Sequence, residues 1–213
     1  MHNTILEQWQ YKATQNSKNI VIPDGCRDIL FWASKGQAPR CTITSLDEKS
    51  YYAAINADDY LQGFRLKAGT IIKQQQLISS LKGLEHGHEE ISDRIENFTS
   101  LCPNVKEALA CLASDIIRIS EAAKLLGVST RTLQRLVKSQ TGRTPAAWLS
   151  LARVRKTARI IGSSVNLAQS AIICGYSDQA HMNREFRRWL NITPAKINSY
   201  PEILRQLDNL AYN

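Results

Sequence analysis

Arginine and amide side chains recur at helical spacing in two short stretches of the C-terminal half. The first set is Thr130, Arg131, Gln134, Arg135 and Lys138, and the second is Gln179, His181, Asn183, Arg184, Arg187 and Arg188. Spacings of three and four residues place each set along one side of a helix. Arginine, glutamine and asparagine can form bidentate hydrogen bonds with guanine and adenine edges in the major groove. Both sets are therefore candidates for reading double-stranded DNA.

The two stretches belong to an internal repeat. Residues 121–129 align with residues 169–177 at an offset of 48, and one inserted residue after the turn changes the offset to 49. The matched positions keep a small residue, a glycine, an apolar residue, an arginine and a Thr-Pro pair: Ala123 with Ala171, Gly127 with Gly175, Val128 with Tyr176, Arg135 with Arg184, and Thr144-Pro145 with Thr193-Pro194. Two copies of one supersecondary unit explain this agreement better than chance.

Each copy has the features that a helix-turn-helix needs. The small residue allows two helices to cross closely, the glycine supplies a left-handed backbone after the first helix, and the apolar residue fills the turn. Ser129 in the first copy, and Ser177 or Asp178 in the second, can cap the helix that follows. These second helices, expected at about residues 129–140 and 178–190, each bury an apolar stripe. The stripes are Leu133, Leu136 and Val137, then Met182, Phe186, Trp189 and Leu190.

A solvated basic face on an ordinary helical bundle is the alternative interpretation of these charges. One charged stripe would favour it, but here two stripes occupy equivalent places in two repeats, each behind a glycine turn. Between the copies, residues 146–161 predict a helix with one apolar side that ends near Gly162. A helix of about 16 residues spans about 24 Å and could hold two reading helices about 34 Å apart, one turn of B-DNA.

The positive charge is confined to the same segment. The formal net charge is +8, yet residues 114–200 hold 14 Lys and Arg against 4 Asp and Glu, and the rest of the chain is slightly acidic. This asymmetry indicates a polyanionic partner, either nucleic acid or an anionic membrane surface. Without a long apolar run or a signal peptide, the sequence predicts a cytoplasmic protein that makes no membrane contact. We expect residues 114–200 to bind DNA on their own.

The N-terminal part has a different pattern. Residues 1–75 predict a small β-rich regulatory domain, because short apolar runs and a period of two recur, and turn residues such as Pro23-Asp24-Gly25 separate them. About 70 residues is little for an independent core, so this domain is expected to lean on the next segment or on a second copy. We expect it to serve in dimerisation or in sensing a signal or ligand.

The remaining segments complete an α+β fold. Residues 76–113 predict a helical connector with a break from Gly83 to His88, and its stripe of Leu77, Leu81 and Leu84 would suit the interface of a homodimer. Residues 201–213 are expected to be a C-terminal tail. The predicted order is a small β-rich N-terminal domain, a helical connector, and an all-α C-terminal domain with two helix-turn-helix units joined by a long helix.

Residues 114–200 resemble the AraC/XylS family of bacterial transcription regulators. The matching stretches are Ile119-Ser120-Glu121-Ala122-Ala123, Gly127-Val128-Ser129, Arg131-Thr132-Leu133-Gln134-Arg135-Leu136, Gly142-Arg143-Thr144-Pro145, Arg153-Val154, Gly175-Tyr176-Ser177-Asp178-Gln179, Arg184-Glu185-Phe186-Arg187-Arg188 and Thr193-Pro194. The resemblance implies reading helices in successive major grooves, RNA polymerase as a partner, and an effector that the sequence does not identify. It implies that the base-reading positions are Arg131, Gln134, Arg135, Gln179, His181, Asn183 and Arg184.

This chain departs from the family pattern at three positions. The family usually has alanine at the position of Thr157, a large aliphatic residue at that of Ser170 and glycine at that of Asn191. Asparagine tolerates the left-handed backbone, so the last change is mild. The two hydroxyls fall at core-facing positions, where we expect them to loosen the packing of the second unit.

The stretch around Pro23-Asp24-Gly25-Cys26 resembles a small β-domain that precedes some members of this family. Cys26 invites a redox or alkyl-acceptor role, but a buried structural thiol is the favoured interpretation, and an odd number of cysteines argues against a disulfide framework. His86 and His88 lack a second ligand cluster for a metal site. The sequence shows no catalytic motif, so it predicts neither an enzyme nor a cofactor.

Overall fold

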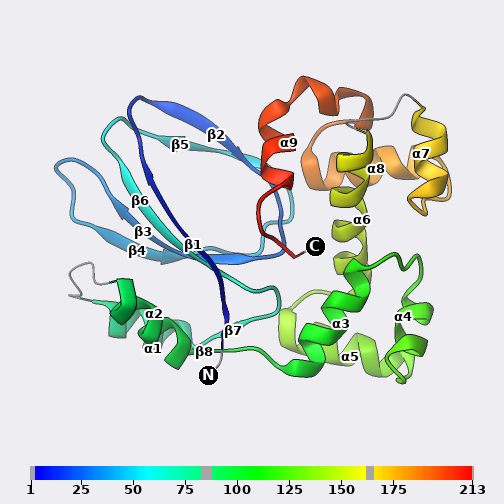
Figure 1. Ribbon diagram of the computed structural model, residues 1–213, viewed down its shortest axis with the longest axis horizontal. Coiled ribbons are helices and arrows are strands. Elements are labelled where there is room, and N and C mark those ends of the chain that lie inside the picture. The colour runs from blue at the N-terminus through cyan, green and yellow to red at the C-terminus, as the bar shows by residue number, and fades with distance from the viewer. Residues whose placement is uncertain (1–2, 83–87, 162–165, 213) are drawn as a thin grey trace.

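A computed structural model describes residues 3–82, 88–161 and 166–212. Antiparallel sheets form one half of the molecule and helices form the other, with α9 (Pro201–Leu207) between them (Figure 1). The chain is therefore α+β, with its β-rich part first, as predicted. The expected connector break ran from Gly83 to His88; residues 83–87 and the helix end near Gly162 lie outside the described residues, and the chain is helical from His88.

The β-rich part contains one four-stranded sheet and two strand pairs. Its strands are β1 (Ile5–Lys12), β2 (Ser17–Val21), β3 (Arg27–Ala33), β4 (Arg40–Ile43), β5 (Tyr51–Ile55), β6 (Tyr60–Leu66), β7 (Ile71–Ile72) and β8 (Thr99–Ser100). The four-stranded sheet has the order β1-β6-β3-β4, while β2 pairs with β5 and β7 with β8. The expected turn between β2 and β3 forms at Gly25, whose φ of +77° lies in the left-handed region.

One face of the four-stranded sheet is covered by α1 (Gln74–Leu81) and α2 (His88–Asn97). Side chains from both layers form one buried cluster: Ile29, Phe64, Leu66, Leu77, Leu81, Ile91 and Ile95. The prediction that the connector leucines face a second copy is therefore wrong for Leu77 and Leu81, which are 0% and 5% exposed within their own chain. The sheet needs an apolar cover, and this stripe provides it. Leu84 lies outside the described residues.

The helical half begins earlier than the charge pattern suggests. Its elements are α3 (Pro103–Ala113), α4 (Ile119–Leu125), α5 (Thr130–Thr141), α6 (Pro145–Ile161), α7 (Leu167–Ile173), α8 (Gln179–Leu190), a 3-10 helix η1 (Pro194–Ser199) and α9. Helix α3 packs against α4, α5 and α6. Its Val105, Leu109 and Leu112 are buried in the core that holds both helix-turn-helix units. We infer that α3 is structurally part of that core and that a fragment starting at residue 114 would lose it.

The segment after residue 200 is folded and is not a loose tail. Helix α9 buries Ile203 and Leu207 and contacts both α6 and β2. Beyond it, the backbone amide of Tyr212 donates to the carbonyl of Asp24 (2.9 Å), and the Tyr212 ring packs edge-on against Trp148 at 4.7 Å between centroids. The end of the described chain therefore joins the β-rich half to the helical half.

The Pro-Asp-Gly-Cys loop is one point where the β-rich half contacts α6. A Cβ atom at Gly25 would lie 2.6 Å from Cβ of Tyr212 and 2.8 Å from a ring atom of Trp148, so only glycine fits. Beside it, the guanidinium of Arg155 from α6 is fully buried and donates to the carbonyl of Pro23 (3.3 Å). The motif therefore has a packing role at the contact between the two halves.

Truncation tests whether α3 belongs to the helical half. Each buried Val or Leu side chain that is lost removes about 1.5–3 kcal/mol of burial free energy. We expect a fragment of residues 102–213 to unfold cooperatively on heating, and a fragment of residues 114–213 to melt at a clearly lower temperature or without cooperativity. Circular dichroism at 222 nm measures both. Equal melting temperatures would contradict the assignment of α3.

Candidate nucleic-acid interface

The two helix-turn-helix units share one set of backbone hydrogen bonds at the turn. In the first unit the amide of Gly127 donates to the carbonyl of Lys124 (3.1 Å) and the amide of Val128 donates to that of Ala123 (3.0 Å). The counterparts in the second unit join Gly175 to Ile172 (3.0 Å) and Tyr176 to Ala171 (2.9 Å). This pair of bonds is the Schellman motif that ends a helix at a left-handed residue, and both glycines are left-handed, with φ of +65° and +76°.

The second helix of each unit, called here the reading helix (α5 and α8), begins and ends in the same way in both copies. The Ser129 hydroxyl accepts a hydrogen bond from the amide of Thr132 (3.1 Å), and the Asp178 carboxylate accepts one from the amide of His181 (2.6 Å). Of the two predicted caps for α8, Asp178 is thus the one that forms. The bond to the His181 amide holds the pKa of Asp178 below its usual value.

The C-terminal ends of the reading helices are also equivalent. Gly142 and Asn191 are left-handed, with φ of +75° and +57°, and lie at the repeat offset of 49. Asn191 therefore stands where the family pattern has glycine, and it adopts the left-handed backbone that was expected there.

The predicted apolar stripes face inward. Leu133 and Val137 of α5 and Met182, Phe186, Trp189 and Leu190 of α8 are buried, and Leu136 is partly buried. The turn residues differ from each other: Tyr176 is 5% exposed, whereas Val128, which was expected to fill the first turn, is 38% exposed. The first turn faces open space, since a Cβ atom at Gly127 would meet nothing within 4 Å, while one at Gly175 would meet Ile117.

The two buried hydroxyls in the second unit find partners. The Thr157 hydroxyl donates to the carbonyl of Arg153 (2.7 Å), and the Ser170 hydroxyl donates to the carbonyl of Asn166 (2.9 Å). Both residues are fully or nearly fully buried. A buried hydroxyl that has a hydrogen-bond partner carries little desolvation cost. The structure therefore gives no reason to expect that Thr157 and Ser170 loosen the packing of the second unit.

The predicted base-reading residues lie on the outward side of the two reading helices. On α5 and its start, the exposed residues are Thr130, Arg131, Gln134, Arg135 and Lys138, and on α8 they are Gln179, Arg184, Arg187 and Arg188. His181 and Asn183 are partly buried. The His181 ring packs edge-on against Tyr176 at 5.4 Å and lies 3.2 Å from the Ser177 hydroxyl.

Lys138 and Arg188 also make contacts within the chain. The ammonium of Lys138 donates to the carbonyl of Gly142 (2.6 Å) at the end of α5. The guanidinium of Arg188 lies 3.9 Å from Glu185 and stacks over Trp189 at 5.0 Å. Both side chains are exposed, as are those of Arg131, Gln134, Arg135 and Arg184.

Helix α6 fixes the two reading helices relative to each other. In Figure 1 it runs between the units, with α4 and α5 near one end and α7 and α8 near the other. Two indole groups make the attachments: Trp148 Nε1 of α6 donates to the hydroxyl of Thr141 in α5 (2.9 Å), and Trp189 Nε1 of α8 donates to the hydroxyl of Ser150 in α6 (2.7 Å). We infer that α5, α6 and α8 move as one unit.

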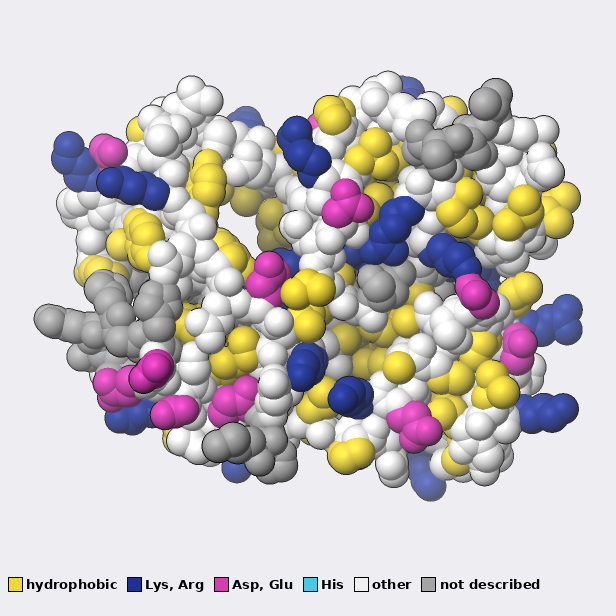
Figure 2. Space-filling model, in the orientation of Figure 1, with side chains coloured by type: hydrophobic (Ala, Val, Ile, Leu, Met, Phe, Trp, Pro, Cys, Tyr) yellow, Lys and Arg dark blue, Asp and Glu magenta, His cyan; other side chains and the backbone are white. Residues whose placement is uncertain are grey.

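A basic groove between the two units was missed from the sequence. It has a volume of about 480 Å³ and includes Arg118, Arg153, His181 and Arg188. Arg153 also donates to the carbonyl of Ile117 (2.9 Å), while Arg118 is exposed. Arg118 precedes α4 and Arg153 lies on α6, so no spacing within one helix links these two to the reading faces, whereas His181 and Arg188 belong to α8. In Figure 2, Lys and Arg side chains project from the outer edge of the helical half, whereas Asp and Glu gather near α2.

The β4–β5 loop, residues 44–50, contacts the C-terminal ends of both reading helices. The amide and hydroxyl of Ser50 donate to the carbonyls of Trp189 (2.9 Å) and Leu190 (2.7 Å) at the end of α8. Arg143, just after α5, donates to the carbonyls of Leu46 and Asp47, each at 2.8 Å. The Arg143 guanidinium also lies over the rings of Trp148 and Trp189. One loop of the β-rich half therefore touches both units, which sequence periodicity could not show.

Asp47 in this loop has an unfavourable electrostatic environment. Burial, with a further contribution from the nearby Asp24, raises the pKa of Asp47 to about 6, although Arg143 acts in the opposite direction. A raised pKa means that the folded chain favours the protonated carboxyl more than the unfolded chain does. Ionisation of Asp47 at neutral pH therefore lowers the stability of the folded chain.

The other chemical groups considered from the sequence show no site in the described residues. Cys26 is 5% exposed, and its burial raises the pKa of its thiol, so the reactive thiolate is disfavoured. Across the described ranges, no three His, Cys, Asp or Glu side chains gather as a metal site, and no helix is long and apolar enough to cross a bilayer. His86 lies outside those ranges, as does the His88 side chain.

Comparison with known proteins finds a family over the repeat. A family model described as a helix-turn-helix domain matches residues 122–199. The HTH-type transcriptional activator RhaS of Escherichia coli strain SE11 is 31% identical over 108 residues, which cover 50% of this chain and 39% of that protein. RhaS of Escherichia coli strain K12 / DH10B gives the same identity and coverage. The chain thus spans about two fifths of the length of these curated relatives, and it contains a helix-turn-helix domain.

Solved structures with some likeness include two proteins that cover different shares of this chain. One is a transcriptional regulator with an AraC-type DNA-binding domain from Chromobacterium violaceum, which is 26% identical, covers 46% of this chain and 91% of its own, and has a TM-score of 0.42. Another is ToxT from Vibrio cholerae O395, which is 10% identical, covers 96% of this chain and 98% of its own, and has a TM-score of 0.48.

The charge at Asp47 can be tested through the pH dependence of stability. The pKa of Asp47 is higher in the folded chain than in the unfolded chain. Protonation of Asp47 therefore stabilises the fold fully below pH 4, and this contribution is lost as the pH rises through about 6. The Asp47→Asn variant should therefore melt about 2–4 °C above the parent chain at pH 7.5. This gain should disappear near pH 4 in calorimetric scans. Glu48→Gln, at the exposed neighbouring position, is the matched control, and a gain for Asp47→Asn that does not change with pH would contradict the account.

Proposed function

We propose that this chain is a sequence-specific transcription regulator of the AraC/XylS family that inserts α5 and α8 into successive major grooves of double-stranded DNA. The observation that carries the proposal is the repeated unit: two helix-turn-helix elements with the same turn bonds, the same caps and outward faces rich in arginine and amides. The match of residues 122–199 to a helix-turn-helix family supports it.

The geometry suits two adjacent grooves on one face of the duplex. Helix α6 has 17 residues and so spans about 26 Å, which is compatible with reading helices separated by about 34 Å, one turn of B-DNA. Arg131, Gln134 and Arg135 would contact base edges in one groove. Gln179, Asn183 and Arg184 would do so in the next, with His181 at the rim. Lys138, Arg187 and Arg188 would contact phosphates on either side.

The groove between the two units lies where the duplex backbone would pass from one reading helix to the other. Arg118 and Arg188 line this groove, so both can neutralise phosphates there. These contacts would fix the register of the protein on DNA without selecting a sequence. They would add to the base contacts, which select the sequence.

The β-rich half is proposed to receive a signal and to pass it to the helical half. Its β4–β5 loop holds the ends of both reading helices through Ser50 and Arg143, so a shift of that loop would change how α5 and α8 are presented. The curated relatives are named activators, and we extend that direction of regulation, with RNA polymerase as the contact, to this chain. Such a regulator acts at the chromosome, in the cytoplasm of a bacterium.

A homodimer would need a surface other than Leu77 and Leu81, because both side chains are already buried within their own chain. A second copy would place two DNA-binding domains on a repeated or palindromic site and raise the effective local concentration.

Substitution of one arginine in each reading helix tests the two-groove arrangement. Arg131→Ala and Arg184→Ala should each relax sequence preference at different base pairs, about one helical turn apart, at a cost of about 1–3 kcal/mol for the preferred base. Selection from a random duplex library, followed by anisotropy titrations, measures this for each variant. Lys35→Ala, which removes an exposed charge in the β-rich half, is the control. A uniform loss over all sequences would indicate that these arginines contact phosphates only.

Salt dependence tests whether the basic segment acts through phosphate contacts. With about six phosphates neutralised, the plot of log affinity against log salt concentration should have a slope near −5. Anisotropy titrations of the full chain on a selected duplex between 50 and 300 mM potassium chloride would measure it. A slope near zero would contradict a DNA-binding role for the positive charge of residues 114–200.

A further inference from the structure

The side chain of Arg153 in α6 contacts both helix-turn-helix units at once. Its Nη2 donates to the carbonyl of Ile117 (2.9 Å), just before α4 of the first unit. Its guanidinium also lies over the ring of Tyr176, the turn residue of the second unit, with 5.4 Å between Cζ and the ring centroid. We call these three residues the unit clamp. One side chain thereby joins the start of one unit to the turn of the other.

The two segments that Arg153 joins are also packed against each other. A Cβ atom at Gly175, in the turn of the second unit, would lie 3.1 Å from the nearest atom of Ile117. Tyr176 is 5% exposed, and its ring meets the His181 ring edge-on at 5.4 Å. The contacts therefore continue from Arg153 through Tyr176 to a residue of the second reading helix.

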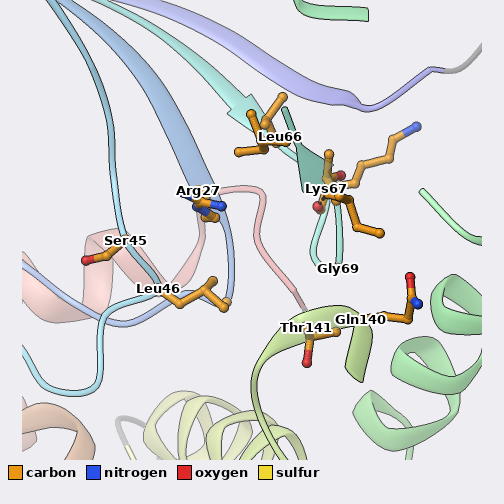
Figure 3. Close-up of a pocket in the computed structure, with 12 residues that line it drawn as sticks. Arg27, Ser45, Leu46, Leu66, Lys67, Gly69, Gln140 and Thr141 are labelled. Atoms are coloured by element: carbon orange, nitrogen blue, oxygen red, sulfur yellow. Dashed lines mark hydrogen bonds between the residues drawn. The ribbon is translucent and has the colours of Figure 1, made fainter. Parts of the chain in front are cut away.

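The tryptophan hydrogen bonds hold the C-terminal ends of the reading helices. Thr141, which accepts from Trp148, is the last residue of α5, and Trp189 lies next to the end of α8. Figure 3 shows this end of α5, marked by Gln140 and Thr141, across a cavity of about 340 Å³ from the β-rich half. The residues proposed to contact bases lie toward the opposite, N-terminal ends. Those ends need a fastening of their own.

A small tilt of α8 would change which base pair it reads. The helix has 12 residues, so it is about 18 Å long. A tilt of about 10° about its C-terminal end moves its N-terminal end by about 3 Å, which is close to the rise of about 3.4 Å per base pair. Arg153 acts on that N-terminal end, because Tyr176 lies three residues before Gln179. The unit clamp is therefore placed where it limits this tilt.

Arginine is suited to make both contacts of the clamp together. A planar guanidinium can lie flat on an aromatic ring and still donate hydrogen bonds from its edge. The ammonium of lysine is a compact charge without a flat face, so it makes one of these contacts at the expense of the other.

We propose that Arg153 is a positioning residue that sets the spacing between the two groups of base pairs read by α5 and α8. This role rests on the proposed function. With both units held at one separation, a duplex whose two read groups are one base pair closer or further apart misplaces one reading helix. Each base pair adds a shift of about 3.4 Å and a rotation of about one tenth of a turn.

Binding to duplexes of altered spacing tests this role. The starting duplex is one that the parent chain selects from a random library, and two others have one base pair inserted or deleted between the read groups. Anisotropy titrations give the spacing penalty, which is the ratio of the dissociation constants for the altered and the selected duplex. For the parent chain we expect a penalty of at least tenfold, because one reading helix loses its base contacts.

Variants assign the spacing penalty to Arg153. Arg153→Met keeps a long side chain without either contact, and it should reduce the penalty at least threefold while the preferred bases within each read group stay the same. Arg153→Lys should give an intermediate penalty. Arg118→Met removes an exposed charge from the same groove, so as the control it should weaken binding to all three duplexes by one factor. A penalty that Arg153→Met leaves unchanged would overturn the proposal and indicate a phosphate contact only.

Tyr176→Leu tests the clamp from its other side and serves if Arg153→Met does not fold, which melting curves show. It should also reduce the spacing penalty. The double variant should add little to either single change, because both substitutions break the same contact. Additive effects on the penalty would contradict a shared clamp.

Hydrogen exchange of the chain without DNA separates the clamp from the proposed function. In Arg153→Met, the amides of Tyr176 and of the first turn of α8 should exchange at least tenfold faster than in the parent chain, whereas Arg118→Met should leave them unchanged. Equal protection in Arg153→Met and the parent would overturn the clamp whether or not DNA binds. Faster exchange in a chain that selects no duplex would contradict the proposed function and still support the clamp.

Discussion

The arrangement of the helical half depends on two tryptophan side chains, whose indole N–H groups hydrogen-bond both reading helices to α6. Trp148 reaches from α6 to Thr141 at the end of α5, and Trp189 reaches from α8 back to Ser150 of α6. Both indoles are buried, so each N–H needs a partner, and each finds one on the neighbouring helix. Arg143 lies over both rings. The relative position of the two reading helices is thereby set by packing rather than by a flexible linker.

The same two tryptophan residues also connect the reading helices to the β-rich half. Trp148 also contacts Tyr212 and the backbone of Gly25, and the carbonyls of Trp189 and Leu190 accept hydrogen bonds from Ser50. A change in the β-rich half therefore has a short physical path to each reading helix. Asp47 lies in the loop that makes these contacts, and its ionisation lowers the stability of the folded chain.

The sequence predicted the parts of the molecule that local chemistry determines. A glycine at a helix end, a capping Ser or Asp and an apolar stripe each have a meaning that does not depend on distant residues, so the repeat predicted Gly127, Ser129 and α8 correctly. The helical pattern of Leu77 and Leu81 also predicted a buried face, but a pattern does not specify what covers it. The contacts of Ser50 and Arg143 join residues more than 90 positions apart, and no periodicity encodes such pairs. The spacing of Ile203, Leu207 and Tyr212 was the available signal that the chain after residue 200 is packed.

The central claim is that one chain places two reading helices in successive major grooves on one face of DNA. Methylation interference at guanine N7, on a selected duplex bound by a single chain, tests it most directly, because N7 lies in the major groove. The account predicts two clusters of interfering guanines about 10 base pairs apart, facing the same side of the duplex. A single cluster, or two clusters on opposite faces about half a turn apart, would contradict it.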